Sequence, residues 1–558
     1  MEFSHQSFFP QTLPSSMNTA SFESLGFSKL FVDFIADKEL TALRFPGNAS
    51  LFYDTEHLHT IATSNRNRAV FLEAIRSTMA QTSFTPEQER NLKFLAEPTS
   101  LTVITGQQVG FLGGALYTML KAWTAIQTAH NLTVSHSSLS FVPVFWIEDN
   151  DHDIDEISSA GMLNSQGEAY TVRSPWSALP ERVAASDVEY DNTLQPVIEE
   201  IIEALPNSEY SYQIAELLRT AYKSGTPVVK AFTALLQHTL GASGMLFVSA
   251  AELRKRGLFA QIATKEMERP GATAAAVAKA SAILTEHGYH AQAQASAVNL
   301  FLHIDGKRHK INTIEGDERF QAGEIIYTKA ELSALAATAP ECFSPAVLLR
   351  PVVQDSIFPN AAYIGGPGEI AYLAQIAELY DLFDVPLSAT LARHSATLLD
   401  SRIEQLCAKQ GVQPSFFMRR YDEVEKDIMH EHENKQLSAE LEATKAAIEQ
   451  AFGRLQPVVT ALDATLAPTA DRMKHQALQG VSDLEAKIRK AQKRLEETTL
   501  GKARKAAAML YPENGLQERS LPYIYFAAKV GLEALSGKMQ LLTKEAANRH
   551  FFVVLDSE

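Results

Sequence analysis

The chain has few of the residues that would tie it together covalently or hold a structural metal. Only two cysteines, Cys342 and Cys407, occur in 558 residues, and they lie far apart in the sequence. This excludes a disulfide framework and a cysteine-based zinc site. Apolar runs long enough to cross a bilayer are also missing. A basic segment followed by an apolar stretch, which would mark a secretory signal, is missing as well. We therefore expect a cytoplasmic protein without a membrane-spanning segment.

Positive charge is scarce as well. Fifty lysines and arginines stand against 66 aspartates and glutamates, which gives a formal net charge of −16. Such an excess of negative charge repels polyanions, so we expect binding neither to nucleic acid nor to anionic membranes. A local basic pocket for phosphates stays compatible with this charge. Apolar residues make up 46% of the chain and charged residues 21%, which is typical of a soluble globular protein, and the length predicts several domains.

The most informative segment combines an apolar run with an acidic cluster. Residues 141–147 are apolar and predict a strand that is buried on both faces of a parallel sheet. Six carboxylates and one histidine follow within residues 148–156. Open α/β sheets bind ligands beyond the carboxyl ends of their strands, so this cluster is a candidate active site. Alternatively, the acids cap the next helix, although six exceed what a cap needs. The candidate catalytic residues are Asp151, His152 and Asp153, with Trp146 as a candidate substrate-binding residue.

A glycine-bearing loop precedes this segment. Residues 101–105 predict a strand and residues 115–129 a helix, which with the strand at 141–147 form a βαβ unit and a Rossmann-like start. Glycines in the loop 106–114 let backbone N–H groups approach a phosphate, although a tight packing turn would use the same residues. The loop matches neither a Walker A motif nor a dinucleotide fingerprint. The candidates here are Gln107 and Gln108 for substrate and Gly106 and Gly110 for nucleotide.

Three later motifs also follow predicted strand ends. The first comes after a predicted strand at 346–350, and its arginine could bind a carboxylate or phosphate or form an internal salt bridge. The second, at 363–375, predicts a strand, a glycine turn and a helix start, and the third, at 392–397, predicts a loop that could hold a triphosphate. A serine in that loop could instead cap a helix. The substrate candidates are Arg350, Gln354, Asp355 and Tyr372, and the nucleotide candidates are Gly365, Gly366, Glu369, Arg393, Ser395 and Thr397.

The character of the chain changes near residue 400. Leu441, Ile448, Leu455 and Leu462 are spaced by sevens, with charged residues between them. This predicts an antiparallel coiled-coil hairpin, with Pro468 in the first turn of its second helix. The expected division is a Rossmann-like core at 1–157 and 341–400, connecting insertions with further core elements at 158–340, a coiled coil at 401–512, and a segment that packs back on the core at 513–558.

Taken in order, these motifs resemble one family. Residues 106–108, 151–153, 350–355, 365–372 and 395–397, followed by a coiled coil and residues 515–519, resemble the bacillithiol biosynthesis family BshC over essentially the whole chain. The resemblance implies an α/β fold with a Rossmann core, connecting insertions and a C-terminal coiled coil involved in dimerisation. It also implies a ligase that adds cysteine to the amino group of glucosaminyl-malate, the last step of bacillithiol synthesis. The family commonly carries Glu where this chain has Asn150, so Glu148 or Asp149 would have to replace that acid.

The same motif order is remotely similar to class I aminoacyl-tRNA synthetase-type nucleotidyltransferases. Their His-x-Gly-His motif is absent, and residues 393–397 replace their Lys-Met-Ser-Lys-Ser motif. We expect ATP with Mg²⁺ to activate the cysteine carboxylate as an acyl phosphate or an adenylate, while zinc is not expected because there is no cysteine cluster. In this scheme Arg393 and the glycine loops hold phosphates, Arg350 binds a substrate carboxylate such as that of malate, and His152 or Asp151 deprotonates the amine. Two other classes stay open, a non-catalytic metabolite-binding coiled-coil scaffold and a metal-dependent phosphohydrolase.

Overall fold

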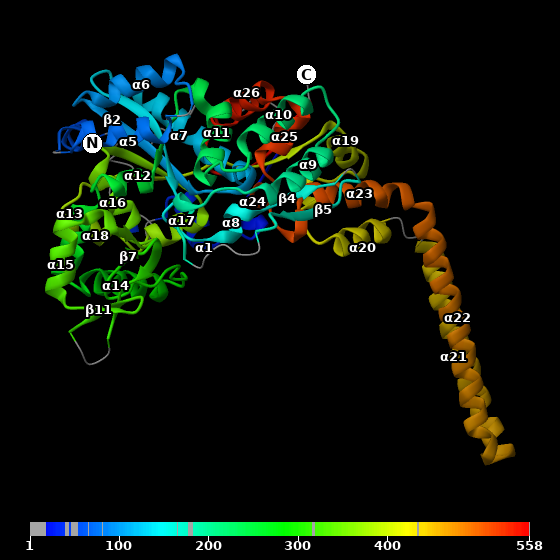
Figure 1. Cartoon of the computed structure of the whole chain (residues 1–558). Coiled ribbons are helices and arrows are strands. Elements are labelled where there is room, and N and C mark those ends of the chain that lie inside the picture. The colour runs from blue at the N-terminus through cyan, green and yellow to red at the C-terminus, as the bar shows by residue number, and fades with distance from the viewer. Residues whose placement is uncertain are drawn as a thin grey trace, which may run out of the picture. The chain divides into compact units, whose positions relative to one another are not determined.

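The chain folds into two compact units. The computed structural model describes residues 18–38, 44–45, 54–64, 66–80, 82–164, 166–176, 182–314, 318–431 and 435–556 (Figure 1). The first unit comprises Met1–Ser401 and Gly515–Glu558, and the second comprises Arg402–Asn514. The first unit is therefore built from two stretches of sequence, because the segment after the second unit belongs to it. No helix in the described part of the chain is both long and apolar enough to span a membrane.

A five-stranded sheet forms the centre of the first unit. Its strands are β2 (Ser100–Gln108), β3 (Ser140–Glu148), β6 (Leu246–Ser249), β13 (Asn360–Gly365) and β14 (Ala389–Ala392), in the order β14-β13-β2-β3-β6. Every neighbouring pair is parallel, which confirms the predicted Rossmann-like core. Pro143, which is unusual inside a sheet because it has no N–H, precedes Val144, the first residue of β3 to pair with β6.

Helices cover this sheet, and the order of its strands determines where a ligand can bind. The helices α4 (Thr55–Thr63), α5 (Arg68–Thr78), α6 (Pro86–Ala96) and α7 (Leu116–Ser135) pack against it. From β2 the chain moves outward to β3 and β6, and then returns to the opposite side of β2 to form β13 and β14. The direction of winding thus reverses between β2 and β13. In open α/β folds such a reversal leaves a crevice at the carboxyl ends of the strands.

A small sheet of β7 (Leu300–Ile304), β8 (Lys307–Lys310) and β12 (Phe343–Pro345) belongs to the insertions. The strands β7 and β8 form a hairpin, and Asp305 and Gly306 in its turn have φ values of 49° and 74°. The strand predicted at 346–350 is wrong, because the helix α16 (Arg350–Ile357) begins there. Pro351 explains the difference: in the first turn of a helix, proline loses no intrahelical hydrogen bond.

A third sheet joins distant parts of the chain. The strands β1 (Thr19–Ala20) and β15 (Ser395–Leu399) both pair with β16 (His550–Val554). The loop predicted at 392–397 is wrong in its second half, because residues from Ser395 onward form β15. Alternate side chains of a strand point to opposite faces, so Ser395 and Thr397 share one face, where both contact His550.

The remaining elements of the first unit connect these sheets. They are α1 (Lys29–Ile35), α8 (Ile154–Ser158), β4 (Ser159–Leu163), β5 (Ala169–Arg173), α9 (Gln195–Ala204), α10 (Ser211–Ala221), α11 (Val228–Leu240), α12 (Ala250–Lys255), α13 (Ala260–Glu268), α14 (Ala272–Glu286), β9 (Asn312–Thr313), β10 (Phe320–Ala322), β11 (Ile325–Tyr327), α15 (Lys329–Thr338), α17 (Pro367–Leu373), α18 (Ala377–Phe383), α24 (Gln517–Ser520), α25 (Tyr523–Val530) and α26 (Leu532–Leu542). Short 3₁₀ turns lie between several of them.

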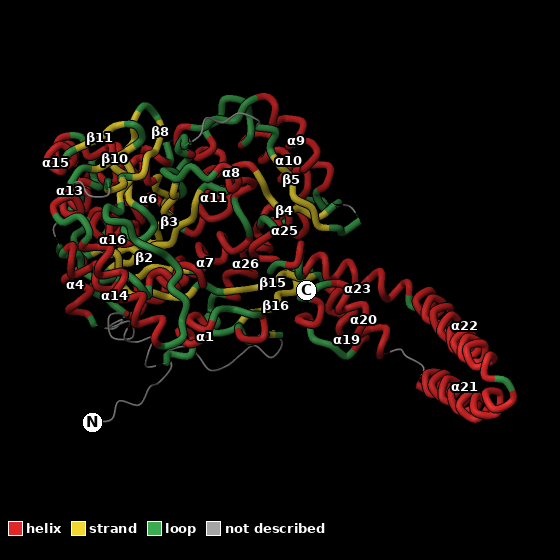
Figure 2. Tube along the Cα trace, turned by 90° about the horizontal axis from the view of Figure 1, so that it is seen from below, coloured by secondary structure: helices red, strands yellow, loops and turns green. Residues whose placement is uncertain are grey.

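The second unit is helical. Its elements are α19 (Ser401–Gln410), α20 (Tyr421–Glu431), α21 (Lys435–Leu462), α22 (Ala467–Leu495) and α23 (Glu497–Leu510). The long helices α21 and α22 pack side by side (Figure 2), and an ion pair of 2.9 Å joins Lys445 Nζ on one to Glu485 Oε2 on the other. This confirms the predicted coiled coil. Helix α21 continues through Pro457, and Pro468 lies in the first turn of α22, as predicted.

Candidate functional site

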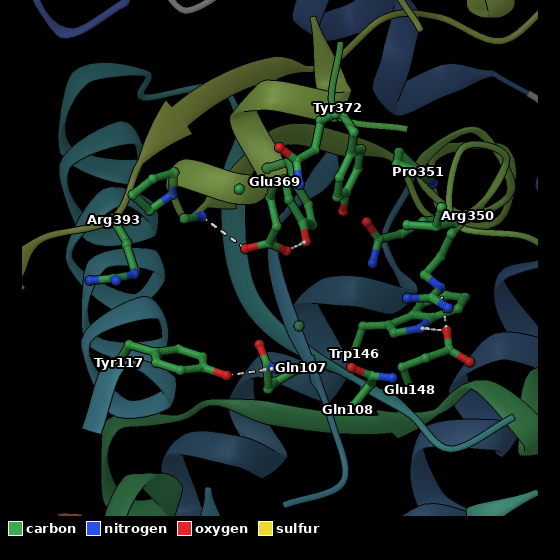
Figure 3. A pocket seen from close by; sticks show the side chains of 18 of the residues that line it. Gln107, Gln108, Tyr117, Trp146, Glu148, Arg350, Pro351, Glu369, Tyr372 and Arg393 are labelled. Carbon is green, nitrogen blue, oxygen red and sulfur yellow. Dashed lines mark hydrogen bonds and ion pairs between the residues drawn. The ribbon is translucent and has the colours of Figure 1, made fainter. Parts of the chain in front are cut away.

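A pocket of about 320 Å³ lies at the carboxyl ends of β2, β3 and β13. This is the crevice where the strand order reverses, so the topology alone would direct a ligand to it. Figure 3 shows Arg393 and Tyr117 at one end, and Arg350, Trp146 and Glu148 at the other. The lining residues are Gly106, Gln107, Gln108, Tyr117, Trp146, Glu148, Gln292, Val347, Arg350, Pro351, Gln354, Tyr363, Gly366, Pro367, Gly368, Glu369, Tyr372, Arg393 and Arg519.

A buried ion pair supports the pocket between its two ends. Lys121 on α7, only 1% exposed, places its Nζ 2.6 Å from Glu369 Oε2 and 2.5 Å from the carbonyl oxygen of Gly106. Glu369 also accepts hydrogen bonds from the Tyr363 hydroxyl and from Gly366 N–H. Burial lowers the pKa of Lys121, against the opposing effect of Glu369. Glu369 is therefore occupied by protein partners, and with Lys121 it joins the end of β2 to the glycine turn after β13.

Charged groups are paired at the Arg350 end. Arg350 lies 2.8 Å from Glu148 Oε2 through Nε and 2.8 Å from Asp151 Oδ2 through Nη2. The indole of Trp146 donates to Glu148, and Arg308 from β8 donates to the other oxygen of Asp151 at 2.8 Å. Burial raises the pKa of Asp151, but the two arginines more than offset this and hold its pKa below the ordinary value. An aspartate stabilised in its ionised form is a weak proton acceptor.

The rest of the acidic cluster divides into different roles. His152 has a lowered pKa because of burial and the nearby Arg308 charge, so its imidazole is neutral at neutral pH. Its Nδ1 is buried and has no hydrogen-bond partner within the described ranges. Asp153 accepts a hydrogen bond from Asp155 N–H as the cap of α8, which is the alternative that the sequence left open. Neither His152 nor Asp153 lines the pocket.

Asn150, where the resemblance led us to expect Glu, is buried. Asn150 donates to Glu148 Oε1 at 3.3 Å and accepts from Arg254 Nε at 2.8 Å. Asp149 faces away from the pocket, accepts from Ser249 and the N–H of Ala251, and has its pKa raised to about 7, chiefly by burial. Of the two acids that could replace the family Glu, only Glu148 lines the pocket. Across the described residues, no three histidine, cysteine, aspartate or glutamate side chains converge as a metal-binding group.

Two arginines meet at the other end of the pocket. The guanidinium carbons of Arg393 and Arg519 lie 5.5 and 6.0 Å from the centre of the Tyr117 ring. Arg393 donates to the buried Glu518 at 2.6 Å, whereas Arg519 is exposed and has no carboxylate partner within the described residues. Burial raises the pKa of Tyr117 to about 12, so its hydroxyl stays neutral. This end carries net positive charge and can bind an anion.

Several predicted site residues lie elsewhere. Asp355 is buried and accepts from Asn360, Tyr380 and Ser388. Gly110 packs against Gly114, whose Cα would lie 2.7 Å from an added Cβ, so this glycine serves a packing turn.

The hydroxyl groups of β15 also form hydrogen bonds with buried protein groups. Ser395 contacts Glu518 and His550, and Thr397 contacts His550 from the same face. The structure thus does not bring Ser395 or Thr397 to the pocket, and Gly365 lies just before the lining residues.

The sequence did not indicate several residues that line or support the pocket, among them Tyr117, Lys121, Gln292 and Arg519. Arg519 had a signal, because it belongs to the 515–519 motif of the family resemblance. Tyr117 and Lys121 lie on the predicted helix after the glycine loop, but an apolar helix gives no local sign that a lysine is buried beneath a ligand site. Gln292 comes from an irregular segment with no motif.

Comparisons with known proteins agree with this architecture. Residues 16–394 match the family model "Bacillithiol biosynthesis BshC, N-terminal Rossmann-like domain", and residues 396–554 match its C-terminal coiled-coil domain. A protein of Chlorobaculum tepidum named "Putative cysteine ligase BshC" is 29% identical over 95% of this chain and 97% of its own. Proteins of the same name from Chloroherpeton thalassium (30%, with the same coverage) and Salinibacter ruber (28%, over 90% and 92%) are also similar. The chain belongs to the BshC family of bacillithiol biosynthesis proteins.

Proposed function

We propose that the pocket is the active site of a ligase that joins the carboxyl group of cysteine to the amino group of glucosaminyl-malate, the last step of bacillithiol synthesis. The observation that carries this proposal is a polar pocket at the reversal of the sheet, whose two ends differ in charge. Amide formation needs such an arrangement, because an activated acid and an amine must be held side by side. The relatives' name, putative cysteine ligase, supports cysteine as one of the two substrates that are joined.

We further propose that ATP supplies the energy, with its phosphates at the Arg393 and Arg519 end. Guanidinium groups pair well with phosphate oxygens, and Arg519 has no competing carboxylate within the described residues. The turn Gly366-Pro367-Gly368 lines the same pocket, and an added Cβ on Gly366 would lie 3.3 Å from Arg393 Nε. The carboxylates at hand, Glu148 and Glu369, already bind protein partners. Mg²⁺ would therefore enter with the nucleotide and not through a dedicated protein site.

The charges at the other end are balanced. Arg308 and Arg350 face Glu148 and Asp151, so these four groups carry no net charge. Because of this balance, we propose that Arg350 positions the two acids. It is less suited to bind the malate carboxylate. The amine of the acceptor meets uncharged hydrogen-bonding groups here, including Tyr372 and Gln354.

The test is an assay of the purified protein with cysteine, glucosaminyl-malate and ATP. We expect bacillithiol to form, and ATP to be consumed only when both other substrates are present. Analysis of the nucleotide product distinguishes an acyl phosphate, which leaves ADP, from an adenylate, which leaves AMP. If neither bacillithiol nor substrate-dependent ATP consumption appears, the proposal is wrong.

We propose His152 as the base for the attacking ammonium group; because its side chain does not line the pocket, the proton would pass to it through a water molecule. Replacing it by alanine is expected to lower kcat by about 10²- to 10⁴-fold, the usual contribution of a general base. Because its pKa is lowered, the neutral base persists through neutral pH, and the acid limb of the wild-type kcat/KM profile should lie below about pH 6.5. The His152→Ala variant should lose this limb, while His475→Ala on α22 should keep it. An unchanged rate and profile in His152→Ala would show that another group is the base.

We propose that the coiled coil forms a homodimer. Leu455, Val458 and Leu462 follow one another at three- and four-residue spacing on α21, and each is at least half exposed, with Leu462 at 84%. One α21–α22 hairpin does not cover these side chains, so a second copy can bury them.

The exposed stripe predicts a dissociating variant. Leu455→Asp combined with Leu462→Asp should convert a dimer to a monomer in sedimentation experiments, because each charge would be buried unpaired in the interface. The double variant Gln456→Asp and Thr460→Asp, at neighbouring positions on the same helix, serves as the control. A dimer that persists in the leucine variant would contradict this interface.

We propose the cytoplasm as the compartment of the protein. Cys342 and Cys407 are free in the structure. A chain that uses no disulfide is suited to a reducing compartment, where ATP is also available.

A further inference from the structure

The residues 290–297 form an irregular segment that reaches the pocket between α14 and β7. They contain neither helix nor strand, and exposed His290, Gln292 and Gln294 alternate with half-buried alanines. The side chain of Gln292 lines the pocket and has no hydrogen-bond partner among the described residues. A free amide can donate two hydrogen bonds and accept others. It is therefore available to a polar ligand.

A buried glutamine holds this segment in place. Gln375 is 1% exposed, and its Oε1 accepts from the N–H groups of Gln292 at 3.1 Å and Ala293 at 3.0 Å. Its Nε2 donates to the carbonyl of Ala293 and to Ser281 Oγ, both at 2.8 Å. All four hydrogen bonds of the amide are thus made, and three go to the backbone of the segment. The Gln375 side chain thus makes hydrogen bonds to the backbone of the segment that a neighbouring strand makes in a sheet.

The far end of the segment is fixed in a similar way. The buried side chain of Asn299 accepts from Ser296 N–H at 2.9 Å and donates to the carbonyl of Ser296 at 2.8 Å. The backbone therefore has anchors on both sides, while Gln292 projects to the pocket. Gln375 follows Tyr372 by three residues, just after the helix that carries Glu369. One short stretch thus shapes the pocket and holds the segment that borders it.

We infer that Gln292 determines specificity for the acceptor of the reaction, and that Gln375 is the positioning residue that sets its place. This inference rests on the proposed function. The phosphates of ATP require the arginines, whereas the hydroxyl groups of an amino sugar require neutral donors and acceptors. Gln292 is exposed and lines the pocket, so its free amide can meet the hydroxyl groups of an acceptor sugar. The chemical class that it recognises is a polyhydroxylated amine.

Kinetics test the role of Gln292. Gln292→Ala should raise the KM for glucosaminyl-malate about three- to tenfold, the effect of one neutral hydrogen bond, with kcat and the KM values for cysteine and ATP unchanged. Gln294→Ala, an exposed neighbour that does not line the pocket, should leave all four constants unchanged. An unchanged acceptor KM in Gln292→Ala, in an active enzyme, overturns the inference and leaves the proposed function intact. If the wild-type protein is inactive, calorimetry can compare the affinities of the wild type, Gln292→Ala and Gln294→Ala for glucosaminyl-malate.

Hydrogen exchange tests the role of Gln375 without any activity. Gln375→Leu should accelerate exchange at the amides of Gln292 and Ala293 and raise the acceptor KM as Gln292→Ala does. Gln375→Glu keeps the acceptor oxygen, so its Gln292 and Ala293 amides should retain most of the protection. This variant replaces the leucine variant in the experiment if the latter does not fold. The positioning role is overturned if both amides in Gln375→Leu are as protected as in the wild type. It is also overturned if both amides already exchange rapidly in the wild type.

Discussion

Arg350→Met should reduce kcat/KM by at least about 100-fold, because the loss of a positioning contact at an active site commonly has an effect of this size. Arg350 holds both Glu148 and Asp151 at 2.8 Å. Without it, the two acids lose a shared cation inside the pocket and repel each other. Steady-state kinetics with all three substrates measure the loss.

A surface arginine with the same connectivity provides the control. Arg219 also bridges two acids, Glu199 at 2.7 Å and Glu216 at 2.8 Å, but on the exposed face of α10. Arg219→Met should leave activity at the wild-type level, because water screens exposed ion pairs. Equal effects of the two substitutions would show that Arg350 has no special role in the pocket.

Glu518→Ala should lower the free energy of unfolding by about 3–5 kcal/mol, because it leaves the buried charge of Arg393 without its partner. Glu518 is fully buried and accepts from Arg393, from Ser395 Oγ and from the N–H of Ala396. Urea denaturation measures the difference, and Glu203→Ala on the exposed face of α9 should show no loss. A similar small change in both variants would contradict the importance of the buried pair.

The stability that Glu518 contributes should depend on pH. Burial raises its pKa, but the charge of Arg393 outweighs this effect, and the net pKa is below the ordinary value. A group with a lowered folded-state pKa stabilises the protein above its unfolded-state pKa, about 4.3 for glutamate. This stabilisation is lost as the pH falls through the lower folded-state pKa. The free energy of unfolding should therefore differ between the wild type and Glu518→Ala by a constant amount at neutral pH. This difference should become smaller below about pH 4.

Local patterns predicted the centre of the fold well. The strands predicted near 101–105, 141–147 and 363 became β2, β3 and β13, and the residues at their carboxyl ends include pocket residues such as Gln107, Trp146 and Gly366. Position at a strand end is a local property. It can therefore be predicted without knowledge of the neighbouring strands.

What a polar residue does at such a position is not local. Ser395 and Thr397 have the composition of a phosphate loop, but they pair with His550, more than 150 residues later. From the sequence alone, Asp151 could be a free base. In the structure Arg308, from a distant hairpin, donates a hydrogen bond to it. Gln292 reaches the pocket only because Gln375 holds its backbone. In each case a long-range contact decides whether a side chain is free to meet a ligand.

The split of the first unit around the helical unit has a consequence for synthesis on the ribosome. Arg393 is made 125 residues before Glu518, and at about 5–20 residues per second this interval lasts about 6–25 s. During that time β15 has no β16 beside it, and the charge of Arg393 has no acid to neutralise it. The pocket can mature only after the helices of the second unit have been translated. A nascent chain that stalls before residue 515 would expose an open strand edge, which is a site for aggregation.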